Sequence, residues 1–279
     1  MIEKNPYTLA LAGQLAEIPF QLIHHLRASR PLARPEKHLF GPKWRQYLLL
    51  WLPPDDIPLK NSVAMLWHGG GWRVGWPGLH PTLAEFFLRE GFPVVMPAYR
   101  LAPFASHRQM REDLSLALRY TLNLLKERNL ENKKLLIGGV SAGGTLAAHL
   151  VYDRSELDKS GYGQELFSGF MSFAGPLDLD LMPDFRAVRH YAGGKPGSPA
   201  FYAANPVRYL SENEQIPALL IHGATDAIVP YACSESFFEK YTGPKWLQPL
   251  RDKTHLDVMR FATDDIATAE LLRDWLKNK

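Results

Sequence analysis

One serine stands in a sequence context typical of enzymatic nucleophiles. Ser141 is the centre of a Gly-x-Ser-x-Gly pentapeptide, residues 139–143, which follows the apolar run 135–137 and precedes the helix-forming segment 145–151. On a tight strand-to-helix turn, a serine hydroxyl projects above the sheet, and the helix places its positive end beside a developing oxyanion. The two motif glycines leave room for neighbouring backbone. Because short motifs also arise by chance, a glycine-rich turn with an unreactive serine is the alternative.

A base and an orienting carboxylate follow this serine in the required order. A nucleophilic serine on such a turn is followed along the chain by Asp or Glu and then by His. Asp226 comes just after the apolar run 218–221, and His255 is the only histidine beyond it. We therefore predict that Ser141 is the nucleophile, His255 the base and Asp226 its orienting acid. A solvated turn aspartate and a structural histidine are the alternatives.

A glycine-rich loop supplies candidate donors for an oxyanion. Residues 68–72 read His-Gly-Gly-Gly-Trp and follow the apolar run 63–67. Three consecutive glycines let the backbone curl so that successive N–H groups converge on one point. The N–H of Ala142, after the nucleophile, is expected to join them, and His68 to brace the loop. A phosphate-binding loop is the competing interpretation, but the Gly-Lys-Ser/Thr ending and the G-x-G-x-x-G spacing are missing.

These residues must be held by an alternating series of strands and helices. Apolar and helical patterns predict strands at 45–51, 63–67, 93–96, 134–138, 170–174, 218–221 and 247–250, and helices at 81–90, 108–128, 233–241 and 264–276, the last capped by Thr263. This alternation predicts the α/β class, with a mostly parallel sheet covered on both faces. Sites in such sheets lie at the carboxyl ends of the strands, where each candidate residue falls.

Two further segments are expected to cover the site. Residues 11, 15, 18, 22 and 26 are apolar at helical spacing, with Pro19 expected to kink or divide the helix, and 32–42 is expected to be a linker. Residues 175–210 are predicted as loops and short helices. We expect a single domain, 1–279, with 1–40 and about 176–210 as cap segments. A membrane-surface helix is the alternative for the first segment, but its basic residues are few and late.

Composition excludes several classes of protein. The chain has 279 residues, 46% hydrophobic and 22% charged, as in one globular domain with a small cap. A net charge of +3 is too mild to indicate nucleic acid or an anionic membrane as partner. Cys233 is the only cysteine, which excludes an internal disulfide and argues against a thiolate metal site. No secretory signal pattern or bilayer-spanning run is found, so the cytoplasm is the expected location.

With these residues identified, the chain resembles carboxylesterases of the α/β-hydrolase superfamily over essentially its whole length. The matching motifs are the loop 68–72, residues 99–103 (Tyr-Arg-Leu-Ala-Pro), the turn 139–144 and residues 222–230. They are similar to those of the hormone-sensitive-lipase-like group and the feruloyl/acetyl-xylan esterase-like group. The last motif is nearer to the feruloyl/acetyl-xylan and kynurenine-formamidase-like branch.

The resemblance implies an oxyanion hole formed by Gly70, Gly71 and Ala142, a cap built from the N-terminus and the insertion after the sixth strand, and no metal or organic cofactor. The sequence departs from the usual pattern at three positions. Val140 replaces a polar residue before the serine, Phe104 replaces a common Glu, and Leu256 follows the histidine where Gly or Phe is usual. These departures loosen the subfamily and substrate assignment.

The expected function is a serine carboxylesterase acting on a small-molecule ester, with neither nucleic acid nor a membrane as partner, as a monomer or homodimer. Aromatic residues in loops are candidates for substrate binding, foremost Trp72, Phe104 and Tyr191, and further Trp76, Phe185, Phe201 and Tyr202. Cap packing is the alternative role for each. Crowded aromatics favour short acyl chains or aryl esters. A kynurenine-formamidase-like amidase, a small-peptide hydrolase and a non-catalytic binding protein on the same fold are the alternative functions.

Overall fold

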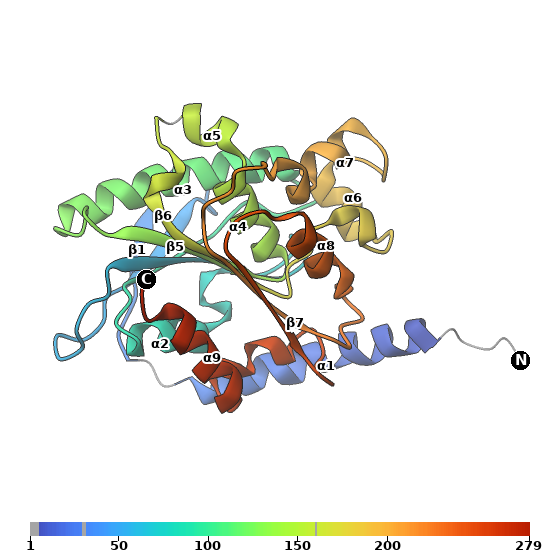
Figure 1. The fold of residues 1–279 in the computed structure, drawn as a ribbon, viewed down its shortest axis with the longest axis horizontal. Coiled ribbons are helices and arrows are strands. Elements are labelled where there is room, and N and C mark those ends of the chain that lie inside the picture. The colour runs from blue at the N-terminus through green and yellow to red at the C-terminus, as the bar shows by residue number, and fades with distance from the viewer. Residues whose placement is uncertain (1–5, 30–31, 160) are drawn as a thin grey trace, which may run out of the picture.

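A twisted, mostly parallel sheet forms the centre of the molecule (Figure 1). The structure is a computed structural model that describes residues 6–29, 32–159 and 161–279. Within them the strand order is β1-β2-β4-β3-β5-β6-β7-β8, with β1 and β2 antiparallel to their neighbours and the others parallel. The strands are β1 (Glu36–Leu39), β2 (Tyr47–Trp51), β3 (Ser62–Trp67), β4 (Val94–Pro97), β5 (Lys134–Val140), β6 (Phe167–Phe173), β7 (Ala218–Gly223) and β8 (Lys245–Leu250).

Helices cover both faces of this sheet. They are α1 (Pro6–Ala28), α2 (Pro81–Arg89), α3 (His107–Glu127), α4 (Ala142–Tyr152), α5 (Arg154–Lys159), α6 (Arg186–Ala192), α7 (Pro199–Ala204), α8 (Ala232–Lys240) and α9 (Ile266–Leu276), with short 3-10 helices η1 (Pro77–Leu79), η2 (Gln164–Leu166), η3 (Leu179–Leu181), η4 (Pro206–Tyr209) and η5 (Asp257–Ala262). One apolar cluster joins the sheet to α3, α4 and α8, and another joins it to α2, η5 and α9. Figure 1 shows α3 on one side and α2 with α9 on the other. The predicted α/β class is confirmed.

Local details differ from the sequence predictions at several elements. β2 begins at Tyr47 rather than at residue 45, and the expected linker 32–42 contains the edge strand β1. Helix α9 begins at Ile266, and its cap is Asp265, whose Oδ1 accepts the N–H of Thr268 at 3.1 Å. The predicted cap, Thr263, was wrong. A capping side chain accepts the N–H two or three residues further along the chain, and since the helix begins at Ile266, the residue in that position is Asp265. In the described ranges, no helix is long and apolar enough to cross a membrane.

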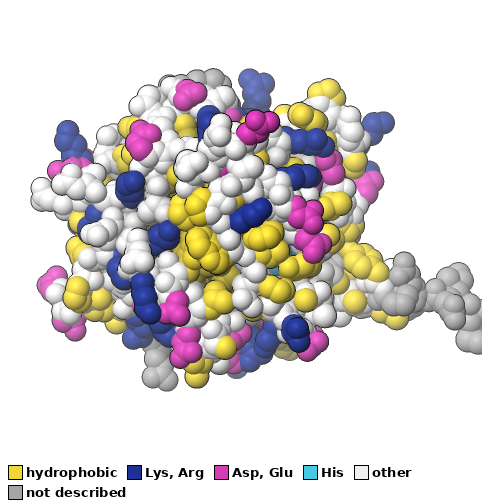
Figure 2. Space-filling model, in the orientation of Figure 1, with side chains coloured by type: hydrophobic (Ala, Val, Ile, Leu, Met, Phe, Trp, Pro, Cys, Tyr) yellow, Lys and Arg dark blue, Asp and Glu magenta, His cyan; other side chains and the backbone are white. Residues whose placement is uncertain are grey.

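Helix α1 is continuous through Pro19, so the expected division of the helix is not found. Proline removes the hydrogen bond to the carbonyl of Leu15, and Leu15 is exposed, so water can reach this side of the helix. The predicted apolar face is correct only in part: Leu11 and Ile18 are half-buried. Leu15 and Leu26 are about half exposed, whereas Gln14 is buried; Leu22 lies outside the residues whose side chains are described. Figure 2 shows hydrophobic side chains on the projecting part of α1, besides a group in the middle of the face.

The insertion between β6 and β7 consists of loops and short helices, as predicted, and Asp178 ties it to the body. Asp178 accepts hydrogen bonds from Asn205 Nδ2 (3.0 Å), Ser236 Oγ (2.7 Å) and Lys240 Nζ (2.9 Å). Burial alone would raise the pKa of Asp178, but the hydrogen bonds from Asn205, Lys240 and Ser236 lower it below the ordinary value. The insertion is therefore held to α8 by an ionised carboxylate.

We predict that Asp178→Asn destabilises the fold at neutral pH but not in acid. A carboxylate whose pKa is lowered by folding stabilises the native state above its unfolded pKa of about 3.9, and this contribution is lost as the pH falls through the folded value. Urea unfolding followed by tryptophan fluorescence should show that the free energy of unfolding of the variant is lower than that of wild type by about 2 kcal/mol at pH 7. This difference should become smaller below pH ~4. Exposed Asp184→Asn is the control and should change little; a pH-independent loss for Asp178→Asn would contradict the prediction.

Candidate active site

The turn that carries Ser141 has the strained geometry expected of a nucleophile. Ser141 lies between β5 and α4 with φ 52° and ψ −123°, a conformation that L residues rarely adopt. Its N–H donates to Phe173 O at 2.8 Å, which ties the turn to β6. A Cβ at Gly143 would lie 2.1 Å from Trp67 O, and one at Gly139 would lie 2.2 Å from the Gly143 carbonyl carbon. Both glycines are therefore needed for close backbone approach, as the sequence predicts.

The structure brings the predicted serine, histidine and aspartate into hydrogen-bond contact. His255, in the loop after β8, has its Nε2 2.8 Å from Ser141 Oγ and its Nδ1 2.6 Å from Asp226 Oδ2. Because Nδ1 faces a carboxylate, it carries the proton, which leaves the Nε2 lone pair to accept the serine hydroxyl. His255 and Asp226 are buried, whereas Ser141 is half-buried and so remains accessible.

Both oxygens of the Asp226 carboxylate lie against hydrogen-bond donors. Oδ1 accepts the N–H groups of Ile228 (2.9 Å) and Val229 (2.8 Å), and Oδ2 lies 3.2 Å from His222 Nε2 as well as against His255. Burial alone would raise the pKa of Asp226, but the neighbouring His255 and the hydrogen bonds from His222 and His255 hold it well below its usual range. The carboxylate is therefore ionised beside the imidazole.

His222 is a site residue to which the sequence assigned no role. Its ring is fully buried, with Nε2 3.0 Å from Val229 O and 3.2 Å from Asp226 Oδ2. Both of these oxygens are acceptors, so Nε2 carries the proton and Nδ1 accepts the hydroxyl of Ser234 at 2.7 Å. The only signal in the sequence was its place four residues before Asp226, in the motif 222–230.

The glycine loop that follows β3 lies against the nucleophile. A Cβ at Gly69 would be 3.4 Å from the Ser141 Cβ. Gly70 (φ +117°) and Gly71 (φ +57°) adopt left-handed conformations, and Gly70 O accepts the N–H groups of residues 73 and 74 at 3.1 Å each. Among the described residues, the N–H groups of Gly70, Gly71 and Ala142 donate to no other backbone carbonyl. These three N–H groups, the predicted oxyanion donors, thus have no backbone acceptor among the described residues.

Buried polar side chains brace this loop from the body of the fold. His68 Nδ1 donates to Gly69 O at 2.7 Å, and its ring stacks on Tyr99 at 4.3 Å between centroids. Burial lowers the pKa of His68 to about 3, so the ring stays neutral, in keeping with the expected bracing role. Arg45 donates to Gly75 O and to Tyr99 O, both at 2.6 Å. Arg45 was missed, because its sequence position indicated only the start of a strand.

The aromatic candidates for substrate binding are separated by the structure. Trp72 and Tyr191 stack at 4.2 Å between ring centroids and are buried, so that α6 packs on the glycine loop through them. Phe104 is 97% exposed. Of the further aromatic candidates, Phe201 is buried, Trp76 and Tyr202 are exposed, and Phe185 is partly buried. Trp72 and Tyr191 thus present almost no open surface to a substrate in this structure.

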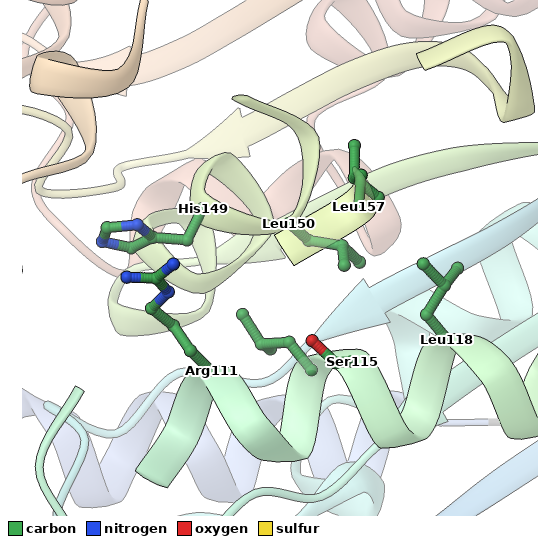
Figure 3. A pocket seen from close by; sticks show the side chains of 7 residues that line it. Arg111, Ser115, Leu118, His149, Leu150 and Leu157 are labelled. Atoms are coloured by element: carbon green, nitrogen blue, oxygen red, sulfur yellow. The ribbon is translucent and has the colours of Figure 1, made fainter. Parts of the chain in front are cut away.

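A small pocket elsewhere has no part in this arrangement. It lies between α3, α4 and α5 (Figure 3), and its lining residues are Arg111, Leu114, Ser115, Leu118, His149, Leu150 and Leu157. Leucine side chains line most of it, while Arg111 and His149 lie close together at one end. Ser141, Asp226 and His255 do not border it. This pocket therefore belongs to the packing of α3, α4 and α5 and is separate from the hydrogen-bonded residues around Ser141.

We predict that Gly143→Ala strongly destabilises the protein. The added Cβ would meet Trp67 O and His68 O, which are backbone atoms in a buried strand end and cannot yield without moving the turn. Thermal unfolding should show a free energy of unfolding that is lower than that of wild type by about 3 kcal/mol. Gly13→Ala is the matched control, because a Cβ there meets nothing within 4 Å, and alanine should stabilise α1 by up to about 1 kcal/mol. Equal stability of the two variants would contradict the packing argument.

Comparison with known proteins identifies relatives that carry esterase names. The chain is 26% identical over 240 residues to a probable isoprenylcysteine alpha-carbonyl methylesterase of Oryza sativa subsp. japonica, an alignment that covers 79% of this chain and 56% of that protein. It is 34% identical over 103 residues to an ethyl acetate hydrolase of Pseudomonas putida, covering 36% of this chain and 32% of that protein. The chain thus spans only about half of the first relative's length and a third of the second's.

The fold and the family follow from two further similarities. Esterase B from Lactobacillus Rhamnosis (HN001) superposes with a TM-score of 0.73 at 18% identity, over 97% of this chain and 96% of that one. Together with the sheet order and the strand-turn-helix at Ser141, this similarity establishes the expected α/β-hydrolase fold. Residues 50–241, well over half of the chain, match the family model BD-FAE. The chain therefore belongs to the BD-FAE family.

Proposed function

We propose that this chain is a serine carboxylesterase that hydrolyses short-chain acyl or aryl carboxylic esters. The observation that carries the proposal is the continuous hydrogen-bonded series from Ser141 Oγ through His255 to Asp226, with distances of 2.8 and 2.6 Å. This series has the tautomer and the order of roles needed to activate a serine. Relatives named as esterases and the BD-FAE family match support the same reaction class.

In the proposed mechanism, Ser141 Oγ attacks the ester carbonyl while His255 Nε2 takes the hydroxyl proton. The ionised Asp226 stabilises the imidazolium formed, and the N–H groups of Gly70, Gly71 and Ala142 hold the tetrahedral oxyanion. Collapse of this intermediate breaks the ester C–O bond, and the alcohol leaves with the proton from His255. His255 Nε2 then takes a proton from water as the water oxygen attacks the acyl carbon; the bond between this carbon and Ser141 Oγ breaks, Oγ takes the proton from His255, and the acid is released. Every proton thus passes through one imidazole nitrogen.

The preference for small esters rests on the surroundings of the site. Trp72 and Tyr191 fill the space between the glycine loop and α6, so this side offers no long apolar channel within the described residues. The relative named ethyl acetate hydrolase supports a short acyl group.

We further propose that the described part of α1 and residues 176–210 act as the cap of a single domain. The lone Cys233 fits a cytoplasmic location, which we propose as well.

We predict a maximum of activity at two to four acyl carbons, abolished by Ser141→Ala. Initial rates on p-nitrophenyl esters from acetyl to palmitoyl test the substrate class. The variant should lose about 10⁶ in kcat, because the nucleophile and its base act as a unit, and should unfold at the wild-type temperature. Wild-type-like turnover by Ser141→Ala would overturn the assignment.

Two other outcomes would favour the alternative functions. Turnover of an N-formyl anilide such as N-formylkynurenine, with weak turnover of all the esters, would favour a kynurenine-formamidase-like amidase. Failure of Ser141 to react with a fluorophosphonate probe, together with no turnover, would favour a non-catalytic binding protein. The same probe applied to Ser141→Ala controls for labelling at other residues.

A further inference from the structure

The first helix makes a direct polar contact with the loop that carries the proposed acid. We define the acid loop as residues 224–229, between β7 and the segment leading to α8. Gln14 Nε2 donates to Thr225 O at 2.7 Å, and Gln14 Oε1 accepts the N–H of Ala227 at 3.0 Å. These partners are the residues immediately before and after Asp226. One amide side chain thus holds the backbone on both sides of the carboxylate.

The contact lies within the buried face of α1, between the half-buried Leu11 and Ile18. Gln14 is 8% exposed, whereas its neighbour Leu15 is 48% exposed and Phe20 is 74% exposed. Tyr7, two helical turns earlier on the same face, donates its hydroxyl to Ala227 O at 3.0 Å. A helix that docked only to bury apolar surface would turn Leu15 inward as well. Instead Leu15 is exposed, and the polar side chain of Gln14 lies on the acid loop.

The acid loop has further support, since the N–H groups of Ala224 and Thr225 donate to Leu250 O and Lys253 O. The carboxylate is held by N–H groups of residues 228 and 229 and by His222 and His255. Gln14 instead acts on the peptide groups that flank Asp226, and it lies outside residues 50–241, which match the family model. Because a misplacement of about 1 Å can reduce catalysis about 100-fold, restraint of this backbone has functional weight.

We propose that Gln14 is a positioning residue for the acid of the active site. By fixing the acid-loop backbone, it keeps Asp226 Oδ2 at hydrogen-bond distance from His255 Nδ1, so α1 is part of the hydrolytic apparatus and not only a cover. This inference rests on the proposed serine-hydrolase function. It assigns Gln14 an effect on the reaction of Ser141, although Gln14 touches neither substrate nor the reacting atoms.

The test replaces Gln14 by methionine, which keeps the length and helix preference of the side chain but removes both hydrogen bonds. Leu15→Met is the matched control, since it introduces the same residue at the adjacent exposed position. We expect about tenfold lower kcat for Gln14→Met on the best short-chain ester, KM within about twofold of wild type, and slower fluorophosphonate labelling of Ser141. Leu15→Met should match wild type in all three.

A double-mutant comparison separates positioning from simple stabilisation. If Gln14 acts through Asp226, Gln14→Met should reduce kcat by less than about twofold in an Asp226→Asn background. The proposal is overturned if Gln14→Met has wild-type kcat, if the loss is equal in both backgrounds, or if only the number of labelled sites falls while kcat per labelled site is unchanged. Wild-type protein with neither turnover nor labelling would instead refute the proposed function, and this inference with it.

Discussion

A buried, ionised carboxylate is the feature that most constrains this structure. Removing Asp226 from water carries a free-energy cost of several kcal/mol unless hydrogen bonds and an adjacent imidazole compensate for it. The fold compensates with donors from the acid loop, His222 and His255. Each of these donors requires a fixed position of the β7 end, the acid loop or the loop after β8. The order of this corner of the molecule therefore follows from one charge.

The same logic applies, with neutral groups, to the glycine loop. Its N–H groups can donate to an oxyanion only if they have no other acceptor and if the backbone of the loop is held in a fixed conformation. Tyr99 donates its hydroxyl to His68 O, and Arg45 donates to Gly75 O and to Tyr99 O. The Trp72–Tyr191 stack links the loop to α6. The insertion 176–210 is in turn tied to α8 by Asp178. The insertion, the glycine loop and the sheet are thus connected through these contacts.

The features that follow from local sequence patterns could be predicted, whereas contacts between residues distant in sequence could not. Ser141, Asp226 and His255 could be predicted because each follows a strand, and parallel strands bring their carboxyl ends to one edge. The α/β class followed from alternating apolar patterns for the same reason. Arg45 and His222 could not be assigned, since their partners are set by tertiary packing. The face predicted for α1 was right at Leu11 and Ile18 but wrong at Leu15, because the acid loop, distant in sequence, holds Gln14 inward instead.

The contacts of α1 also bear on how the chain reaches its native state. Gln14 and its partners Thr225 and Ala227 are separated by 211 and 213 positions, and the loop bearing His255 comes later still. Contacts of such high sequence separation form late, because closing the intervening chain has an entropic cost that only prior folding of the sheet can reduce. During synthesis, α1 leaves the ribosome long before its docking site exists. The apolar side chains that α1 buries on docking, Leu11 and Ile18, are therefore exposed until the sheet and the acid loop have formed.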